Sequence, residues 1–481
     1  MSIVRHVLAA FSIAGLGYFA LFGIINIAFL CMAWRKLATF RHARSYTSLD
    51  DTFASPFTPG ISVLVPGYNE EAGIVSSVRS LLDLRYPRHE VIVINDGSTD
   101  SMLEQLKSAF DLVPVRQAVR THVETEPIRA AYVSRRHSNL CVLDKENGGK
   151  ADALNAGINT AAYPYFCAID ADAVLEHDAL LRIVQPMVDR PGVAVAAGGI
   201  VRIANGCQIE AGRVVSYGLP KNRLATMQVV EYFRAFLVGR LGLDSLRCLV
   251  IISGAFGLFS RAVVEEVGGY ARGTVGEDME LATRMHAHLR RQGEPFEISF
   301  VPDPVCWTEA PETLGGLSRQ RRRWQRGLGE TLWTYRRAML NPRYGALGLF
   351  ALPYFLIFEF LGSVFQAFGV VVVIVAFILG AFSVLFFAAF MAVSILLGLL
   401  ISAGTVVLEE YVVHRYQRRR EIARLVLYST LESFGYRQLA SFWAVQGLID
   451  VLRRKSGWGA QQRLGLERGA EVPLPPGGTP A

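Results

Sequence analysis

The stretch Phe166-Cys167-Ala168-Ile169-Asp170-Ala171-Asp172-Ala173 decides how the rest of this chain is interpreted. An apolar run typical of a buried strand ends at two carboxylates, and alternate residues of an extended backbone point the same way. Carboxylate oxygens hold Mg²⁺ or Mn²⁺, and such ions usually keep open positions that a diphosphate can fill. Asp170 and Asp172 therefore form a candidate metal site, although most Asp-x-Asp pairs are solvated loop residues.

The composition places an apolar segment at the N-terminus. The 481 residues are 51% hydrophobic with a mean hydropathy of +0.30, yet 19% are charged, so the apolar residues must be concentrated in parts of the chain. Residues 1–45 contain an uncharged run that can cross a hydrocarbon core of ~30 Å, with its span at about 7–33. Because no cleavage site follows this run, we expect an uncleaved transmembrane anchor.

A second apolar block, Ala346 to Leu408 within residues 344–410, contains one charge, Glu359. It is too long for one upright helix, and Pro353 can kink it. We expect an interfacial entry and then two transmembrane helices, at about 358–380 and 383–408. Residues 46–343 between the two apolar parts have the mixed composition of a globular domain, where the chemistry should lie.

The basic residues cluster beside these spans. The net charge is +7, but this pattern fits a membrane protein better than a nucleic-acid-binding protein. The positive-inside rule then predicts an integral, multi-pass protein of the inner (cytoplasmic) membrane, with its N-terminus outside and its middle domain cytoplasmic. The six cysteines form no Cys-x-x-Cys pair, which predicts a reducing compartment without a zinc site or a disulfide framework.

The C-terminal part is harder to assign. Residues 411–468 hold a basic loop and an apolar stretch, 425–452, that contains charges and a central Gly435. We favour a kinked amphipathic helix at the interface over a further span, because crossing would place basic residues outside. Residues 469–481, rich in Pro and Gly, should be a disordered tail.

The middle domain alternates predicted strands, turns and helices. Strands at 61–66, 90–94 and 140–143 predict a parallel sheet, whose ligands bind at the carboxyl ends of the strands. Tyr68 could stack there on a base, and Asp96 could accept hydrogen bonds from a base or ribose. Alternatively, Asp96 only shapes a turn.

Lys150 follows a Gly-Gly turn and opens a predicted helix, which suits phosphate binding, whereas the alternative is a surface lysine. Gly254 lies in a small-residue stretch, Ile251 to Gly257, that lets a substrate approach the backbone. Asp278 could be a general base at a helix N-terminus, or merely favour the helix dipole. Gln320 and Trp324 lie one helical turn apart, with Arg323 near them, in a strongly basic segment.

These motifs, taken in order, resemble the signature of the membrane-bound family 2 glycosyltransferases: Asp96, the Asp170 and Asp172 pair, Glu277-Asp278 and Gln320-x-x-Arg323-Trp324. The chain is similar to the processive β-glycan synthases that make cellulose, chitin, hyaluronan and poly-N-acetylglucosamine. The resemblance implies an α/β GT-A fold, a Rossmann-like nucleotide-sugar-binding domain inserted between transmembrane helices. It also implies a UDP-sugar donor and a growing glycan as acceptor.

The resemblance further implies a role for each motif residue in an inverting, metal-dependent transfer. Donor binding falls to Tyr68, Glu70, Asp96, Lys150, Asp152 and Asp170. The metal, Mg²⁺ or Mn²⁺, falls to Asp170 and Asp172, and proton removal to Asp278 beside Glu277. The acceptor and diphosphate side falls to Gly254, Phe256, Gln320, Arg323 and Trp324.

The sequence leaves several points open. A single-addition transferase acting on a lipid-linked acceptor is an alternative, and a non-catalytic export or scaffold subunit is another. The Gln-x-x-Arg-Trp segment favours the polymer synthase. Few predicted spans are available to build an export path through membrane lipids, which leaves self-association or an export partner open.

Overall fold

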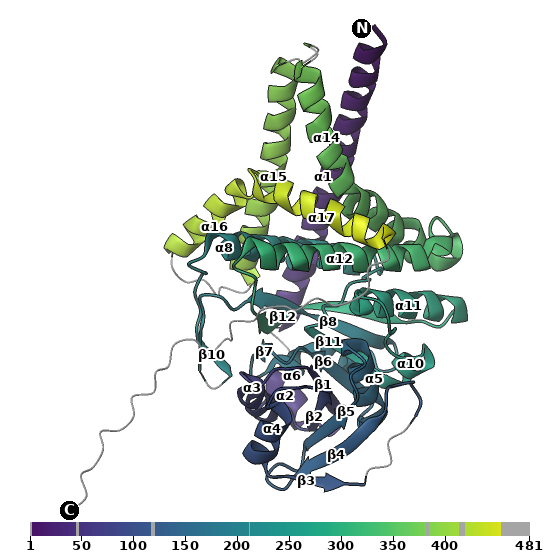
Figure 1. The fold of residues 1–481 in the computed structure, drawn as a ribbon, viewed down its shortest axis with the longest axis vertical. Coiled ribbons are helices and arrows are strands. Elements are labelled where there is room, and N and C mark those ends of the chain that lie inside the picture. Colours follow the sequence, from purple (N-terminus) through teal and green to yellow (C-terminus); the bar gives the residue numbers. More distant parts are fainter. Residues whose placement is uncertain are drawn as a thin grey trace, which may run out of the picture.

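The computed structural model describes residues 2–44, 48–116, 121–210, 212–378, 380, 384–412 and 419–453. An α/β domain forms one end of the molecule (Figure 1). Three long helices, α1 (Ser2–Arg44), α14 (Leu361–Ile378) and α15 (Val384–Val412), run side by side away from it. The predicted disordered tail, 469–481, lies outside the described residues.

The α/β domain is built on one ten-stranded sheet of order β3-β4-β5-β2-β1-β6-β11-β8-β12-β7. Its strands are β1 (Ile61–Gly67), β2 (His89–Asp96), β3 (Leu112–Val115), β4 (Ile128–Ser134), β5 (Leu140–Lys145), β6 (Tyr165–Ile169), β7 (Val174–Leu175), β8 (Ala194–Ile203), β11 (Phe256–Ser260) and β12 (Glu297–Thr308). A separate hairpin pairs β9 (Gln208–Glu210) with β10 (Arg213–Ser216).

The predicted parallel sheet is confirmed for its centre only. Strands β5, β2, β1 and β6 are parallel neighbours, so their carboxyl ends meet at one edge. Beyond β6 the sheet is mixed, because β11 pairs antiparallel with both β6 and β8. Strand β11 thereby brings the segment that precedes it, which includes Gly254, to the same edge.

The helices of this domain are α2 (Leu49–Ala54), α3 (Ile74–Leu82), α4 (Met102–Phe110), α5 (Lys150–Thr160), α6 (Ala179–Ile183), α7 (Gln185–Asp189), α10 (Arg261–Glu266) and α11 (Glu277–Gln292). Helix α3 buries Ile74, Val78 and Leu81 on one face, as its helical spacing predicts. Helix α11 ends at Gly293, whose φ of +78° suits a residue without a side chain.

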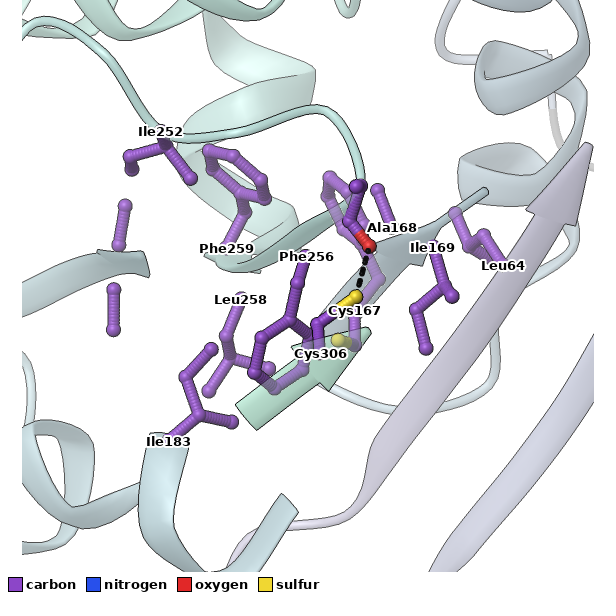
Figure 2. Packing of buried hydrophobic residues seen from close by; sticks show 14 of the residues in the cluster. Leu64, Cys167, Ala168, Ile169, Ile183, Ile252, Phe256, Leu258, Phe259 and Cys306 are labelled. Atoms are coloured by element: carbon purple, nitrogen blue, oxygen red, sulfur yellow. Dashed lines mark hydrogen bonds between the residues drawn. The ribbon is translucent and has the colours of Figure 1, made fainter. Parts of the chain in front are cut away.

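The hydrophobic core packs around the strand that carries the two aspartates. Phe166 of β6 stacks on Phe259 of β11, with ring centroids 5.5 Å apart, and both side chains are buried. Figure 2 shows the neighbours of Cys167, including Leu258 and Phe256. Each large apolar side chain buried here contributes about 1.5–3 kcal/mol. This packing fixes the end of β6, and with it Asp170, relative to β11.

A layer of helices lies between the α/β domain and the pair α14 and α15, and it runs across them, while α1 packs against this layer (Figure 1). Its members are α8 (Arg223–Phe233), a π-helical segment η1 (Arg234–Arg240), α9 (Leu241–Ser245), α12 (Leu314–Thr334), α16 (Arg419–Leu431) and α17 (Tyr436–Leu452). Helices α12 and α17 pack along each other. The predicted kink at Gly435 is confirmed, since this residue separates α16 from α17 with a φ of +93°.

Three described helices are long and apolar enough to cross a membrane, namely Ile13–His42, Leu347–Ile378 and Met391–Tyr411. Each overlaps one of the three predicted spans, but the ends differ from the predicted ones by up to 11 residues. The short elements before α14 are η2 (Arg336–Ala338), η3 (Pro342–Tyr344), η4 (Leu347–Ala351), α13 (Leu352–Tyr354) and η5 (Phe355–Phe360). Pro353 lies between two π-helical turns in that segment, where its missing N–H alters the regular hydrogen-bond ladder.

Candidate active site

The turns after β1 and β2 are joined by hydrogen bonds at the carboxyl edge of the sheet. The side-chain oxygen of Asn69, a residue with a φ of +57°, accepts from the Thr99 N–H at 2.8 Å. The Asn69 N–H donates to Ser98 Oγ at 3.0 Å. These bonds hold Tyr68, which is 50% exposed, beside the end of β2. Its ring is available for stacking, and Glu70 lies half-buried in the same turn.

Asp96, at the end of β2, is buried and anchors the turn before α5. Its two carboxylate oxygens accept from the Gly148 N–H at 3.0 Å and the Gly149 N–H at 2.8 Å. Lys145 lies 2.8 Å from the same carboxylate and is itself fully buried. These contacts support the alternative that Asp96 shapes a turn. The same turn also positions Lys150, the first residue of α5, at the site.

Asp152, predicted as a donor contact, is fully buried behind Asp96. It forms an ion pair with Lys145 at 2.5 Å and another with Arg272 at 3.3 Å. The structure therefore corrects that prediction: Asp152 is buried beneath the surface of the site, where it pairs with Lys145 and Arg272. Sequence reasoning missed Lys145 because it follows Asp144 at a strand end, where a lysine is ordinarily solvated.

Lys150 bridges the end of β6 and the segment before β11. Its ammonium group forms an ion pair with Asp170, donates to the Gly254 carbonyl at 3.1 Å and lies 3.9 Å from Glu277 Oε1. Burial alone lowers the pKa of Lys150, but the charges of Asp170 and Glu277 outweigh it and raise the pKa above its ordinary value. The lysine is therefore a cation, placed where a diphosphate would need one.

Asp278 contacts the same glycine, Gly254, through the glycine N–H. Its Oδ2 accepts from the Gly254 N–H at 3.1 Å, and its Oδ1 accepts from the Met279 N–H at 2.8 Å. A Cβ added at Gly254 would stand 3.0 Å from Lys150 Nζ, so a residue without a side chain fits this narrow space. One glycine residue thus binds a cation through its carbonyl and a candidate base through its N–H.

Glu277 is buried beside Lys150 and Asp278. Burial raises its pKa to about 7, Lys150 opposes that shift and Asp278 adds to it. A carboxyl group with this pKa exchanges protons near neutral pH. Glu277 therefore tunes the charge between Lys150 and Asp278.

Helix α12 brings the Gln-x-x-Arg-Trp segment to the start of α11. The contact is made by two glycines, since a Cβ on Gly327 would meet the Gly276 Cα at 2.7 Å. Gln320 is buried, and its Oε1 has no hydrogen-bond partner among the described residues. Trp324 is 43% exposed, and the guanidinium of Arg321 lies 4.5 Å from its ring. The positive charge of Arg323 lowers the pKa of Glu277, so this arginine lies close enough to act on Glu277 electrostatically.

Phe256, predicted on the acceptor and diphosphate side, does not face the site. Its side chain is fully buried in the hydrophobic core (Figure 2), where it packs against Gly199. Alternate residues of a strand face opposite ways, and Phe256 pairs with Ile169 on β6 with its ring on the core side.

Asp170 and Asp172 stand beyond the end of β6, as predicted. The described residues contain no group of three or more His, Cys, Asp or Glu side chains that could hold a metal ion. Two carboxylates nevertheless fit a Mg²⁺ or Mn²⁺ site of the kind in which water and substrate phosphates supply the remaining ligands. Asp170 is shared with Lys150, which leaves Asp172 as the more direct ligand.

Residues 59–327 match the family described as "Glycosyltransferase like family 2". The chain belongs to this family. A poly-beta-1,6-N-acetyl-D-glucosamine synthase of Staphylococcus epidermidis is 28% identical over 435 residues, which are 85% of this chain and 89% of the relative. The synthase of the same name from Staphylococcus aureus (strain COL) is 30% identical over 276 residues, 57% of this chain and 55% of the relative.

Among solved structures, a mannosyltransferase from Pyrobaculum calidifontis is 17% identical, with a TM-score of 0.49, over 90% of this chain and 99% of that one. Together with the sheet described above, the family match confirms the predicted α/β GT-A domain and identifies the protein as a glycosyltransferase. The three apolar helices flank this enzyme domain in the chain and associate it with a membrane.

Proposed function

We propose that this glycosyltransferase is a membrane-bound synthase that extends a β-linked glycan with N-acetylglucosamine from a UDP-linked donor. The observation that carries the proposal is the pair of Gly254 contacts: its carbonyl accepts from Lys150 on the leaving-group side, and its N–H donates to Asp278 on the acceptor side. The relatives named as poly-beta-1,6-N-acetyl-D-glucosamine synthases support the choice of sugar.

The arrangement suits a single inverting displacement. Asp278 removes the proton from the attacking hydroxyl of the acceptor, and that oxygen forms a bond to the anomeric carbon as the bond to the UDP oxygen breaks. Lys150 and Arg323 face the negative charge that develops on the departing diphosphate. A divalent ion held by Asp172 and Asp170 would supply further neutralisation of that charge.

Glu277 and two aromatic residues, Tyr68 and Trp324, have the remaining roles in the proposed mechanism. Glu277 is neutral or charged according to the pH near 7, so it adjusts how strongly Lys150 attracts the diphosphate. Tyr68 stacks on the base of the donor, and Trp324 on a sugar ring of the acceptor. We place the enzyme domain on the cytoplasmic side, the N-terminus outside, and the product on the route to export.

The test uses the purified full-length protein in lipid nanodiscs with Mg²⁺ or Mn²⁺. UDP release is measured with UDP-glucose, UDP-N-acetylglucosamine and UDP-glucuronate, and product length is measured by mass spectrometry. We expect UDP-N-acetylglucosamine to be preferred and chains of several sugars to form. One sugar per acceptor would instead support a single-addition transferase.

The matched variants for this test are Asp278→Asn and Glu294→Gln, the latter at an exposed position beyond the other end of α11. The first should lower transfer by about 10²–10⁴-fold while UDP still binds. The second should leave the rate unchanged. Wild-type transfer by Asp278→Asn would show that another group removes the proton.

A further inference from the structure

The π-helical segment η1 ends at an arginine whose role no motif explains. A π-helical turn is rare, and single turns of this kind are frequent at functional sites. This one interrupts the run from α8 to α9 and ends at Arg240. Sequence periodicity predicts one regular helix here, so the position of the Arg240 side chain is a tertiary feature.

Two contacts hold the Arg240 guanidinium in a fixed orientation. Its Nε–H donates to the Ile251 carbonyl at 3.3 Å, and its Cζ lies 3.5 Å from the ring centroid of Phe236. The Nη1 atom is buried and has no hydrogen-bond partner among the described residues. A buried donor without a partner costs about 1–3 kcal/mol, and more when charged. A ligand that brings an oxygen to Nη1 would remove this cost.

The surroundings of Arg240 belong to the acceptor side of the site. Ile251 precedes, by three residues, the glycine whose N–H binds Asp278. The Phe236 ring lies 5.8 Å from that of Tyr232, which in turn lies 6.4 Å from that of Trp324. Contacts therefore connect Arg240 in one direction to the segment that binds the base, and in the other, through Phe236 and Tyr232, to Trp324, which is expected to hold the acceptor.

Arg240 keeps its charge in this position. Burial lowers its pKa to about 10, while the negative charge of Asp278 opposes that shift. A guanidinium with this pKa stays protonated at neutral pH. It remains a hydrogen-bond donor when the acceptor enters.

We propose that Arg240 is an acceptor-binding residue, whose Nη1–H donates a hydrogen bond to an oxygen of the terminal sugar of the growing chain. This bond turns the attacking hydroxyl toward Asp278. The inference rests on the proposed function for the identity of the acceptor as a glycan. It adds a residue from a helical segment that carries none of the motif residues.

The experiment compares Arg240→Met, Arg240→Lys and the control Arg223→Gln, which changes an exposed arginine at the start of α8. The acceptor is a short oligosaccharide of whichever sugar the wild-type enzyme transfers. Steady-state rates give KM for the acceptor, KM for the UDP-sugar, and the slow UDP release that occurs without acceptor. Thermal unfolding in the same nanodiscs reports on folding.

Arg240→Met should raise the acceptor KM at least about tenfold, which corresponds to about 1.4 kcal/mol. The KM for the UDP-sugar and the acceptor-independent UDP release should stay within twofold, and Arg240→Lys should recover part of the loss. An unchanged acceptor KM would overturn the proposal. If Arg240→Met and Arg240→Lys both lost the acceptor-independent UDP release and had a lower Tm, Arg240 would have a purely structural role. That result would overturn the proposal as well.

The two proposals fail in different ways. Wild-type transfer of another sugar would overturn the proposed donor specificity but leave the Arg240 comparison intact, since the acceptor is chosen to match. A normal wild-type polymer with an unaffected Arg240→Met acceptor KM would leave the proposed function standing and remove only this inference.

Discussion

Helix α12 crosses the start of α11 at Gly327 and Gly276, and one added carbon atom there should stop sugar transfer. A Cβ at Gly327 would lie 2.7 Å from the Gly276 Cα and 2.9 Å from its N. Carbon atoms in contact lie about 3.5–4.0 Å apart, so the two backbones must separate by roughly 0.8–1.3 Å. Backbone atoms cannot rotate away as a flexible side chain can.

The separation acts on the site without touching a reacting group. The Gln-x-x-Arg-Trp segment lies on α12, whereas Glu277 and Asp278 open α11. A displacement of about 1 Å between groups that must align can cost ~10²-fold in rate. Gly327→Ala should therefore lower sugar transfer by about that factor. Alanine favours a helix by about 1 kcal/mol over glycine, which partly offsets an overpacking cost of about 1–3 kcal/mol, so Tm should fall only slightly.

The assay is the initial rate of UDP release, with UDP binding and Tm measured on the same nanodiscs. Gly315→Ala is the matched control, because a Cβ there meets only Arg319 Nη1, at 3.7 Å, on the same helix. We expect the control to keep the wild-type rate. A Gly327→Ala rate within threefold of wild type would refute the idea that this contact aligns the two motifs.

Three further predictions follow from the site. Lys145→Met would leave Asp96 and Asp152 as buried carboxylates without their shared cation, so the free energy of unfolding should fall by about 3–5 kcal/mol, and an unchanged Tm would contradict this. Burial raises the pKa of Glu277 from 4.5 to about 7. The contribution of this group to the free energy of unfolding, roughly 3 kcal/mol, is therefore fully present below pH 4.5 and is lost as the pH rises through 7. Glu277→Gln should remove that part of the pH dependence of Tm, and identical pH profiles would contradict the assignment. Chelation with EDTA should abolish transfer, Mg²⁺ or Mn²⁺ should restore it, and Asp172→Asn should raise the metal concentration required; full activity in EDTA would exclude the metal site.

The sequence by itself determined the ends of the central strands and the residues that follow them. Apolar runs of strand length stop at polar residues, and parallel strands with helical crossovers must place their carboxyl ends at one edge. Tyr68, Asp96 and Asp170 could therefore be assigned to one site before any contact was known. The three apolar helices were equally accessible, because the hydrocarbon thickness sets their length.

Only the tertiary structure decided which side chains at that edge face the substrate. Asp96 and Asp152 follow strand and turn patterns in the sequence, but both are buried in the structure, where each forms an ion pair with the buried Lys145. Phe256 faces the core and not the site. The alternation of side chains along a strand does not show which face is the core unless the neighbouring strands are known.

Asp170 and Asp172, which follow β6, also show what the sequence determines and what only the fold decides. The sequence supplies two carboxylates two residues apart, and nothing local says whether they are solvated. The fold places Lys150 against Asp170. The carbonyl of Gly254 accepts from Lys150 and its N–H donates to Asp278, so this glycine connects the pair to a residue more than a hundred positions later. Contacts of this kind, like that of Gly276 with Gly327, join segments that are distant in the chain, and packing alone brings them together.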